Sequence, residues 1–143
     1  MTDPALRDLF GLELALLARW WRSRLDERLR PLGLSQARWT ALWHLARGGD
    51  GLTQKQLARA VGVEGPSMVR VLDALERDGL VERRQPPQDR RVRALYLTSS
   101  GRAVLDSIDV QAGEMRASLL SGVTDAELAT CMQVFERIRK AEV

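Results

Sequence analysis

The sequence has very few of the side chains that crosslink a small protein or bind a metal ion. Cys131 is the only cysteine and His44 the only histidine among its 143 residues. One cysteine cannot form an intramolecular disulfide, so nothing points to an oxidising compartment. A zinc site needs several ligands, and His44 has no second histidine and no nearby cysteine in the sequence. We therefore expect no metal ion and no other cofactor.

Long hydrophobic runs are also missing. No segment approaches the roughly 18 consecutive apolar residues that a membrane span needs. The N-terminal residues lack the basic stretch, apolar run and small-residue cleavage site of a secretory signal peptide. These two absences predict a cytoplasmic protein that makes no contact with a membrane.

Sequence signatures of catalysis are absent as well. The chain has no glycine-rich phosphate-binding loop, no cluster of metal ligands and no histidine paired with a nucleophile. No residue is singled out as catalytic, and we expect a protein that is not an enzyme. Cys131 falls on the apolar face of a predicted helix, which indicates a buried and inert thiol.

What the chain does have is a local excess of positive charge. Lysine and arginine together outnumber aspartate and glutamate by 22 to 19, which gives a net charge of +3. Five cations fall within eleven residues, opposed there only by Asp89, and these are Arg83, Arg84, Arg90, Arg91 and Arg93. A cluster of this kind is typical of a surface that binds a polyanion.

Apolar residues recur at helical spacing over most of the chain, and capping residues mark where helices begin. The expected helices cover residues 4–30, 35–47, 53–61, 64–78, 100–119 and 124–140. Thr53 with Gln56, and Thr124 with Glu127, have the spacing of a capping box. The segments LVERR and VRALYLT flank turn residues 86–89, which predicts a hairpin of two short strands.

The same periodicity predicts which side chains are buried. The expected buried positions are Trp39, Leu42, Trp43 and Ala46 in the second helix, and Val69, Leu72 and Leu75 in the fourth. Residues 12–18 are apolar on more than one face of the first helix. A surface helix needs only one apolar stripe, so we expect the first helix to pack against its own domain and against a second subunit.

Residues 52–98 combine a helix-turn-helix pattern with the arginine-rich hairpin. The second helix of the pair begins with Gly65, Pro66 and Ser67, which are small enough to let the helix backbone approach the bases of a major groove. Arg70, one turn later, can donate two parallel hydrogen bonds to a guanine edge. This pattern predicts that the fourth helix is inserted into double-stranded DNA.

The hairpin supplies the second part of the prediction. Arg90 and Arg91 stand at its tip, where they can enter a narrow minor groove of enhanced negative potential. Asp89 is placed to hold the Arg91 guanidinium in one orientation through a bidentate pair. Few functions other than duplex DNA binding require both devices in series.

The stretch LTQKQLARAVGVEGPSMVRVLDALERDGLVERRQPPQDRRVRALYLT resembles the winged helix-turn-helix regulators of the MarR family. The preceding RWWRSRLDERLRPLGLSQARWTALWHL, together with GPSMVRVLDALERDGLVER, is similar to the SlyA-like branch of that family. The resemblance implies a mainly α fold with a small β wing. A winged helix-turn-helix DNA-binding domain would span residues 35–98, and a helical dimerisation domain would be built from residues 1–34 and 99–143.

The resemblance also implies a bacterial, nucleoid-associated homodimer on a pseudo-palindromic operator, with two recognition helices in successive major grooves. The family's recognition-helix motif Pro-Ser-x-x-Arg falls on Pro66, Ser67 and Arg70. The Asp-x-Arg motif of its wings falls on Asp89 and Arg91. These residues, with Gly65 and Arg90, form the expected DNA-binding set.

Members of the family often release DNA when a small aromatic or phenolic acid binds between the dimerisation and winged lobes. The positions similar to those that line that crevice are Arg19, Trp21, Arg22, Trp39 and Trp43. Aromatic walls and a guanidinium suit an apolar ring that carries a carboxylate. The alternative is that these tryptophans, which lie at helical spacing, are ordinary core residues.

Two other functions remain open on the sequence alone. One is a ligand-independent architectural or anti-silencing DNA-binding protein, which would use the same residues. The other is a winged helix that serves as a protein-interaction module, and the arginine-tipped hairpin argues against it.

Overall fold

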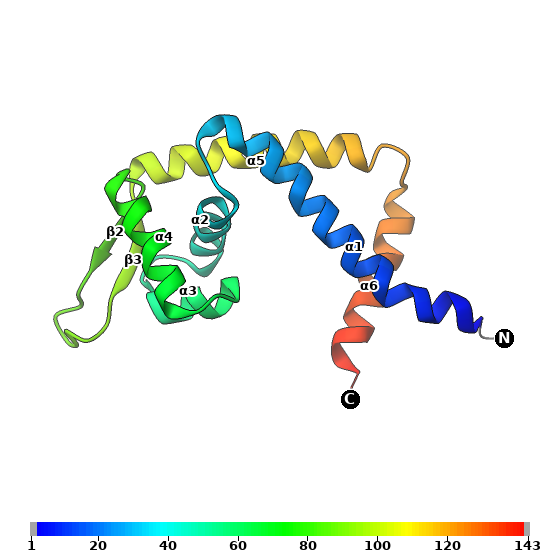
Figure 1. The fold of residues 1–143 in the computed structure, drawn as a ribbon, viewed down its shortest axis with the longest axis horizontal. Coiled ribbons are helices and arrows are strands. Elements are labelled where there is room, and N and C mark those ends of the chain that lie inside the picture. The colour runs from blue at the N-terminus through cyan, green and yellow to red at the C-terminus, as the bar shows by residue number, and fades with distance from the viewer. Residues whose placement is uncertain (1–2, 142–143) are drawn as a thin grey trace. The chain divides into compact units, whose positions relative to one another are not determined.

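The computed structural model describes residues 3–141 and is mainly helical, with one small antiparallel sheet (Figure 1). In chain order its elements are α1 (Pro4–Leu29), a 3-10 turn η1 (Arg30–Leu32), α2 (Gln36–Gly48), β1 (Leu52–Thr53), α3 (Gln54–Val61), α4 (Gly65–Arg77), β2 (Val81–Arg84), β3 (Ala94–Leu97), α5 (Ser99–Leu119) and α6 (Asp125–Lys140). The predicted class, mainly α with a β wing, is confirmed. Within the described range, no helix is both long enough and apolar enough to cross a bilayer.

The chain divides into two compact units, Met1–Gln111 and Ala112–Val143. The first unit contains α1 to β3 and the first part of α5, and therefore holds every residue expected to contact DNA or an effector. The second contains the rest of α5 and α6. The division by function at residues 34 and 98 stays a prediction.

Local capping sets the helix ends as the sequence predicts. The Thr53 hydroxyl accepts the N–H of Gln56 at 3.1 Å, and the Gln56 side chain accepts the N–H of Thr53 at 2.9 Å. The same reciprocal box joins Thr124 and Glu127 at the start of α6. Gly62 ends α3 with φ of 79°, a left-handed conformation that favours glycine.

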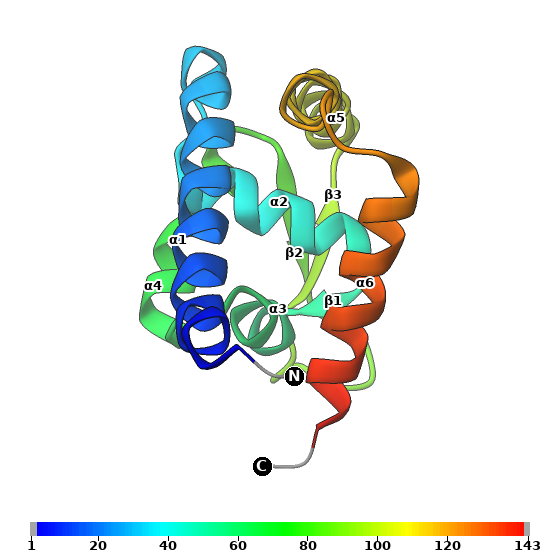
Figure 2. The same ribbon diagram turned by 90° about the vertical axis from the view of Figure 1, so that its right-hand side faces the viewer.

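The core of the first unit brings α2, α3 and α4 together against the sheet. Both α2 and α4 pack on the sheet, and α3 contacts both helices (Figure 2). The largest fully buried side chains are Leu29, Leu42, Leu57, Met68, Leu72, Leu75, Leu95 and Ile108. Since this set includes residues of α1 and α5, those two long helices share one core with the winged lobe.

The buried face of α4 differs from the prediction at one position. Met68 is 1% exposed, whereas Val69 is 36% exposed. Residues 68, 72 and 75 follow the spacing i, i+4, i+7 of a helix face, while 69, 72 and 75 drift off it. The predicted burial of Val69 is therefore wrong, and this valine lies on the surface beside Arg70.

The buried face of α2 is rotated in a similar way. Leu42 and Trp39 are buried as predicted, but the other core residues of this helix are Ala41 and Leu45. Trp43 is 36% exposed, and Ala46 is also exposed. The prediction that Trp43 and Ala46 are buried is wrong, because the α2 stripe passes through Leu45 instead.

The hairpin forms as predicted and gains a third strand. In β2 and β3, Val81 pairs with Leu97 and Arg84 with Ala94. The short strand β1 adds to the other edge of β3, with Leu52 opposite Leu95. A strand of two residues has no alternation to detect, so the sequence did not predict it.

The second unit contains α6, whose side chains are mostly exposed within the described chain. Met132 and Ile138, which lie on one apolar stripe of this helix, are 60% and 48% exposed. Cys131 is exposed as well, so the prediction of a buried thiol is wrong for the isolated chain.

Candidate nucleic-acid interface

The N-terminal end of α4 is open to solvent. Gly65, Pro66, Ser67 and Arg70 are all exposed, as the prediction of a groove-facing end requires. A Cβ added at Gly65 would meet nothing within 4 Å, so its backbone is accessible from outside. Pro66 stands in the first turn, where its missing N–H leaves no helical bond unmade.

The charges on α4 are divided between two sides of the helix. Arg70 is exposed, and no ion pair involving it is found within residues 3–141. Asp73 and Glu76 instead face the wing, where both approach Arg83. Glu64 occupies the N-cap position with extended backbone, but its side chain makes no capping hydrogen bond. The exposed end of α4 thus carries Arg70 and Glu64, for which no ion pair is found within residues 3–141.

The wing is the hairpin of β2 and β3 with the loop of residues 85–93. Figure 1 shows this loop extending beyond the end of the sheet and away from α4. Two of its hydrogen bonds are local, since the N–H of Asp89 donates to Pro86 and that of Val92 to Asp89. At the end of the loop, the Arg93 carbonyl accepts the N–H of Gln54 at 3.2 Å. The loop therefore presents its side chains to solvent on a short, turn-based frame.

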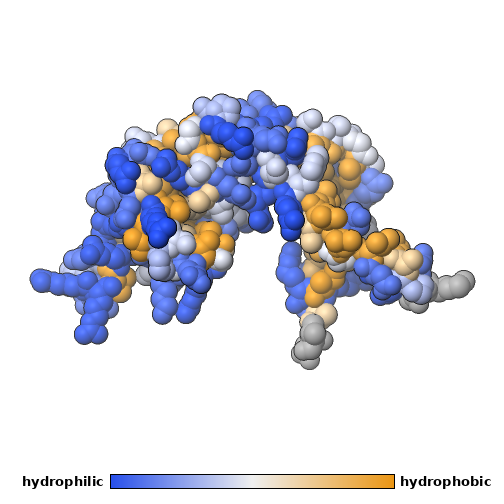
Figure 3. All heavy atoms as spheres, viewed as in Figure 1, coloured by the Kyte–Doolittle hydropathy of each residue, from blue (hydrophilic) through white to orange (hydrophobic). Residues whose placement is uncertain are grey.

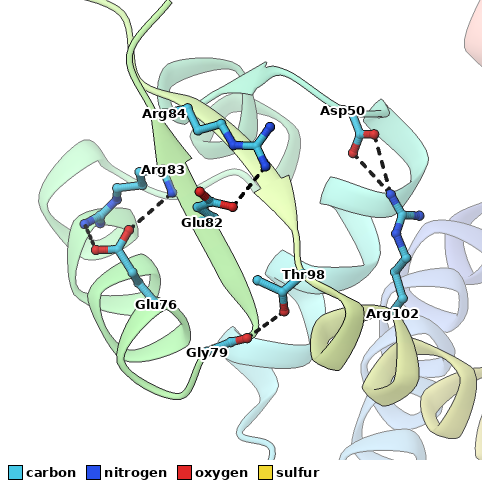
Figure 4. Close-up of polar contacts among 8 residues, drawn as sticks. All are labelled: Asp50, Glu76, Gly79, Glu82, Arg83, Arg84, Thr98 and Arg102. Carbon is cyan, nitrogen blue, oxygen red and sulfur yellow. Dashed lines mark hydrogen bonds and ion pairs between the residues drawn. The ribbon is translucent and has the colours of Figure 1, made fainter.

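The five clustered arginines fall into two groups. Arg83 is held against α4, with its side chain only 16% exposed. Arg84 bonds Glu82 at 3.0 Å (Figure 4). Its guanidinium also stacks over the Tyr96 ring at 4.2 Å. The hydrogen bond and charge of Arg84 lower the pKa of the Glu82 carboxyl, as expected for a formed ion pair.

The remaining three arginines lie in the loop. Arg90, Arg91 and Arg93 are exposed, and no ion pair of their guanidinium groups is found within the described part of the chain. Within the described residues, these three of the five clustered arginines are free to meet a polyanion. Arg83 and Arg84 are already neutralised by neighbours.

Asp89 contacts Arg91 in another way than expected. Asp89 Oδ1 accepts the backbone N–H of Arg91 at 2.9 Å, which closes a turn of the type that aspartate favours. The expected bidentate pair with the guanidinium is absent from the described structure. The carboxylate fixes the backbone that carries Arg91 and leaves its side chain free to reorient.

The residues expected to bind an effector are not all brought together. Trp39 is 8% exposed, and its indole N–H donates to Asp26 Oδ1 at 3.4 Å, so it lies in the core. Trp21 is half-buried, while Arg19 and Arg22 on α1 are exposed. Trp43 lies on the surface of α2, with Arg47 stacked over its ring at 4.5 Å.

A cavity of about 640 Å³ adjoins Trp43. Its walls come from the end of α2, the following turn, Leu97 and the first part of α5, and its charged lining residues are Arg47, Asp50, Arg102, Asp106 and Asp109. Asp50 and Arg102 form an ion pair at 3.4 Å (Figure 4). Of the five predicted effector residues, only Trp43 lines this cavity. The sequence analysis did not find the other residues that line the cavity, because they come from segments far apart in the chain.

The helix-turn-helix of α3 and α4, followed by a three-stranded sheet with an arginine-tipped loop, defines the class of winged helix-turn-helix proteins. A profile of the MarR family matches residues 32–92, which run from the last residue of η1 to the loop of the wing. A solved transcriptional regulator designated PA3341 is 47% identical, with a TM-score of 0.82, over 90% of this chain and 94% of that one. The chain belongs to the MarR family, whose members are transcriptional regulators.

Two more distant structures share the fold. A point variant of E. coli MarR in complex with operator DNA is 24% identical, with a TM-score of 0.78, over 96% of this chain and 99% of that one. CouR from Rhodococcus jostii RHA1, bound to p-coumaroyl-CoA, is 23% identical with a TM-score of 0.79, over 99% of both chains.

Proposed function

We propose that this protein is a SlyA-like regulator that binds a pseudo-palindromic operator as a homodimer. Each copy would insert the N-terminal end of α4 into a major groove and the loop of the wing into the adjacent minor groove. The observation that carries the proposal is the pairing of an open α4 end with three free arginines in the wing loop. Both belong to one sheet-anchored lobe.

The assigned contacts follow from side-chain chemistry. Gly65, Pro66 and Ser67 let α4 approach the base edges, and Arg70 donates to guanine. Arg90 and Arg91 enter the minor groove, and Asp89 shapes the turn that carries them. No reaction is required of any of these residues, so the proposed protein is a regulator and not an enzyme.

The surface of α1 supports the homodimer. Figure 3 shows hydrophobic side chains gathered over this helix, and its exposed apolar residues are Leu6, Leu9, Phe10, Leu12, Leu14, Leu16, Leu17 and Trp20. A soluble monomer rarely exposes so continuous an apolar surface. We assign this face, with the exposed stripe of α6, to contact with a second copy of the chain.

An effector is the less constrained part of the proposal. CouR is a relative by fold that binds an aromatic acyl ligand, which supports a small aromatic carboxylate or phenolic acid here as well. Trp43, with Arg47 and the adjacent cavity, offers an aromatic face and a guanidinium. Arg19, Trp21, Arg22 and Trp39, which the family resemblance also assigns to effector binding, do not line this cavity. An effector must favour a lobe spacing that no longer fits two successive grooves, because a ligand that binds both spacings equally shifts nothing.

Selection of binding sites from a random duplex library, followed by gel shifts, tests the DNA-binding role. Arg70→Ala should lose discrimination at one base pair, about 5- to 150-fold. Arg91→Ala should weaken binding at every operator, and the weakening should diminish as salt rises. Arg24→Ala, which removes an α1 arginine paired with Glu27, is the control for charge alone. A variant at Arg70 or Arg91 that binds like the parent at equal salt would remove that assignment.

Titration of salicylate-like acids into the DNA complex separates the effector-responsive regulator from an architectural or anti-silencing protein. Release of DNA by the parent, reduced in Trp43→Ala, is the expected result. An unchanged complex at saturating acid would favour the ligand-independent function. A monomer that ignores oligonucleotides at low ionic strength would favour the protein-interaction module.

A further inference from the structure

Arg83 occupies a position in β2 that strand alternation assigns to the inner face. Val81, two residues earlier, is 2% exposed, while Glu82 and Arg84 point to the other, exposed face. An arginine on the inner face of a strand is costly unless its charge is paired. The side chain of Arg83 is indeed 16% exposed and lies against α4.

The partners of Arg83 are spread along two turns of α4. One terminal nitrogen of its guanidinium lies 2.7 Å from Asp73 Oδ1 and 3.9 Å from Glu76 Oε1. The other donates to the carbonyl of Val69 at 3.3 Å, and the backbone N–H of Arg83 donates to Glu76 Oε2 at 3.3 Å (Figure 4). Since 69, 73 and 76 lie on one face of the helix, these bonds fix both the distance of β2 from α4 and its position along the helix.

These bonds also lie at the base of the wing loop. Arg84 ends β2, and the loop with the three free arginines begins one residue later. Within residues 3–141, Arg83 makes the last side-chain hydrogen bond from the wing to α4 before the loop starts. The direction in which the loop leaves β2 therefore depends on how firmly β2 is held at Arg83, whereas the other end of the loop is held by the Arg93 carbonyl, which accepts the N–H of Gln54 at 3.2 Å.

We propose that Arg83 is a positioning residue for DNA recognition. Its forked guanidinium locks the wing to α4, so that the loop arginines reach the minor groove while α4 occupies the major groove. Arg83 itself does not contact DNA, because its two terminal nitrogens face Asp73, Glu76 and Val69, and its Nε is buried and has no hydrogen-bond partner within the described residues. This inference rests on the proposed function, the binding of duplex DNA. It adds that Arg83 couples the contact of α4 with the major groove to the contact of the wing loop with the minor groove.

Operators with modified bases measure the two contacts separately. Replacing guanine by 7-deazaguanine removes an acceptor from the major groove only, and replacing adenine by 2,6-diaminopurine adds an amino group to the minor groove only. For the parent, each modified base at a contacted position should weaken binding by about 5-fold or more, as the loss of a specific contact does. This fold-loss of affinity is the penalty of that base. Arg83→Met keeps the apolar stem of the side chain and removes the forked donor.

Arg83→Met should keep the 7-deazaguanine penalty and lose the 2,6-diaminopurine penalty, because α4 still docks but the wing no longer reaches its groove in register. Arg83→Lys, which keeps the charge without the fork, should behave in the same way. Arg84→Met is the matched control, since it removes the neighbouring arginine from the opposite face of β2 and should keep both penalties.

Each result decides the inference. Equal loss of both penalties in Arg83→Met, or retention of both, overturns it, and full rescue by Arg83→Lys overturns the role of the fork. Circular dichroism and thermal melting establish whether each variant is folded at the assay temperature. If Arg83→Met is unfolded, the same two penalties are measured with Arg83→Lys instead. If the parent shows neither penalty on selected operators, the proposed function itself fails, which is a distinct outcome.

Discussion

At the scale of single residues, the arginines between positions 83 and 93 differ in what surrounds them. Arg83 is enclosed by acceptors on α4, and Arg84 is paired with Glu82 on the outer face of the sheet. The loop arginines have no such partners within residues 3–141. Arg83 and Arg84 are therefore used in contacts within the protein. Only the loop arginines of this cluster remain available to bind DNA.

His44 provides a pH-dependent test at this scale. Burial, and then the positive charge of Arg47, lower the pKa of its imidazole below the ordinary value of 6.5. The unfolded chain therefore binds the proton more readily than the folded protein. Stability is fully present above the ordinary pKa and is lost as the pH falls through it.

Urea unfolding of the parent and of His44→Gln measures that loss. Between about pH 7.5 and pH 5.5, the parent should lose more of its free energy of unfolding than the glutamine variant, which has no titratable side chain at position 44. Both proteins must be compared at one protomer concentration, since dimerisation contributes to apparent stability. Parallel pH profiles would mean that the environment of His44 does not disfavour its charged form.

At the scale of elements, the start of α5 shows how the winged lobe is joined to the helix that leaves it. The Thr98 hydroxyl donates to the Gly79 carbonyl at 2.6 Å and accepts the N–H of Gly101 at 3.0 Å. The N–H of Thr98 donates to the Leu80 carbonyl at 3.1 Å. The turn after α4 and the first turn of α5 are thus joined through the hydroxyl and the backbone N–H of Thr98.

Gly101→Ala tests this junction. An added Cβ would collide with the Leu80 carbonyl oxygen, which is backbone and cannot rotate away. We expect the free energy of unfolding to fall by about 1–3 kcal/mol, as for overpacked sites. Gly113→Ala, also within α5, is the control: its Cβ would meet only the end of the Arg116 side chain at 3.8 Å. The control should be neutral or gain up to about 1 kcal/mol through helix propensity, and equal losses in both variants would refute the close approach.

At the scale of the whole molecule, the exposed apolar surface of α1 is the feature that the isolated chain leaves unexplained. Leu17 is 57% and Leu6 69% exposed, and a helix of this composition is stable in water only when its apolar faces are covered. A second copy of the chain would cover them and would also place two recognition helices on one operator. Dimerisation and operator binding are therefore expected to be lost together.

Leu17→Glu tests that link. A carboxylate on the apolar face of α1 should convert the dimer to a monomer in sedimentation velocity. Affinity for a palindromic operator should then fall by about 100-fold or more, because the second half-site no longer binds as part of the same molecule. Leu32→Glu, a similarly exposed leucine in η1, should remain dimeric. A Leu17→Glu protein that stays dimeric would assign the interface to other residues.

The sequence by itself determined the helices, the hairpin and the class of fold, because capping boxes, glycine stops and apolar spacing act within a few residues of the chain. It also located the α4 end and the wing loop as candidate DNA contacts. Tertiary structure alone decided that Met68 is buried and Val69 exposed, that Trp39 lies in the core while Trp43 borders a cavity, and that Arg83 clamps the wing while its loop neighbours stay free. The reason is physical: local signals choose the conformation of the backbone, but burial and ion pairing depend on what another segment places opposite each side chain.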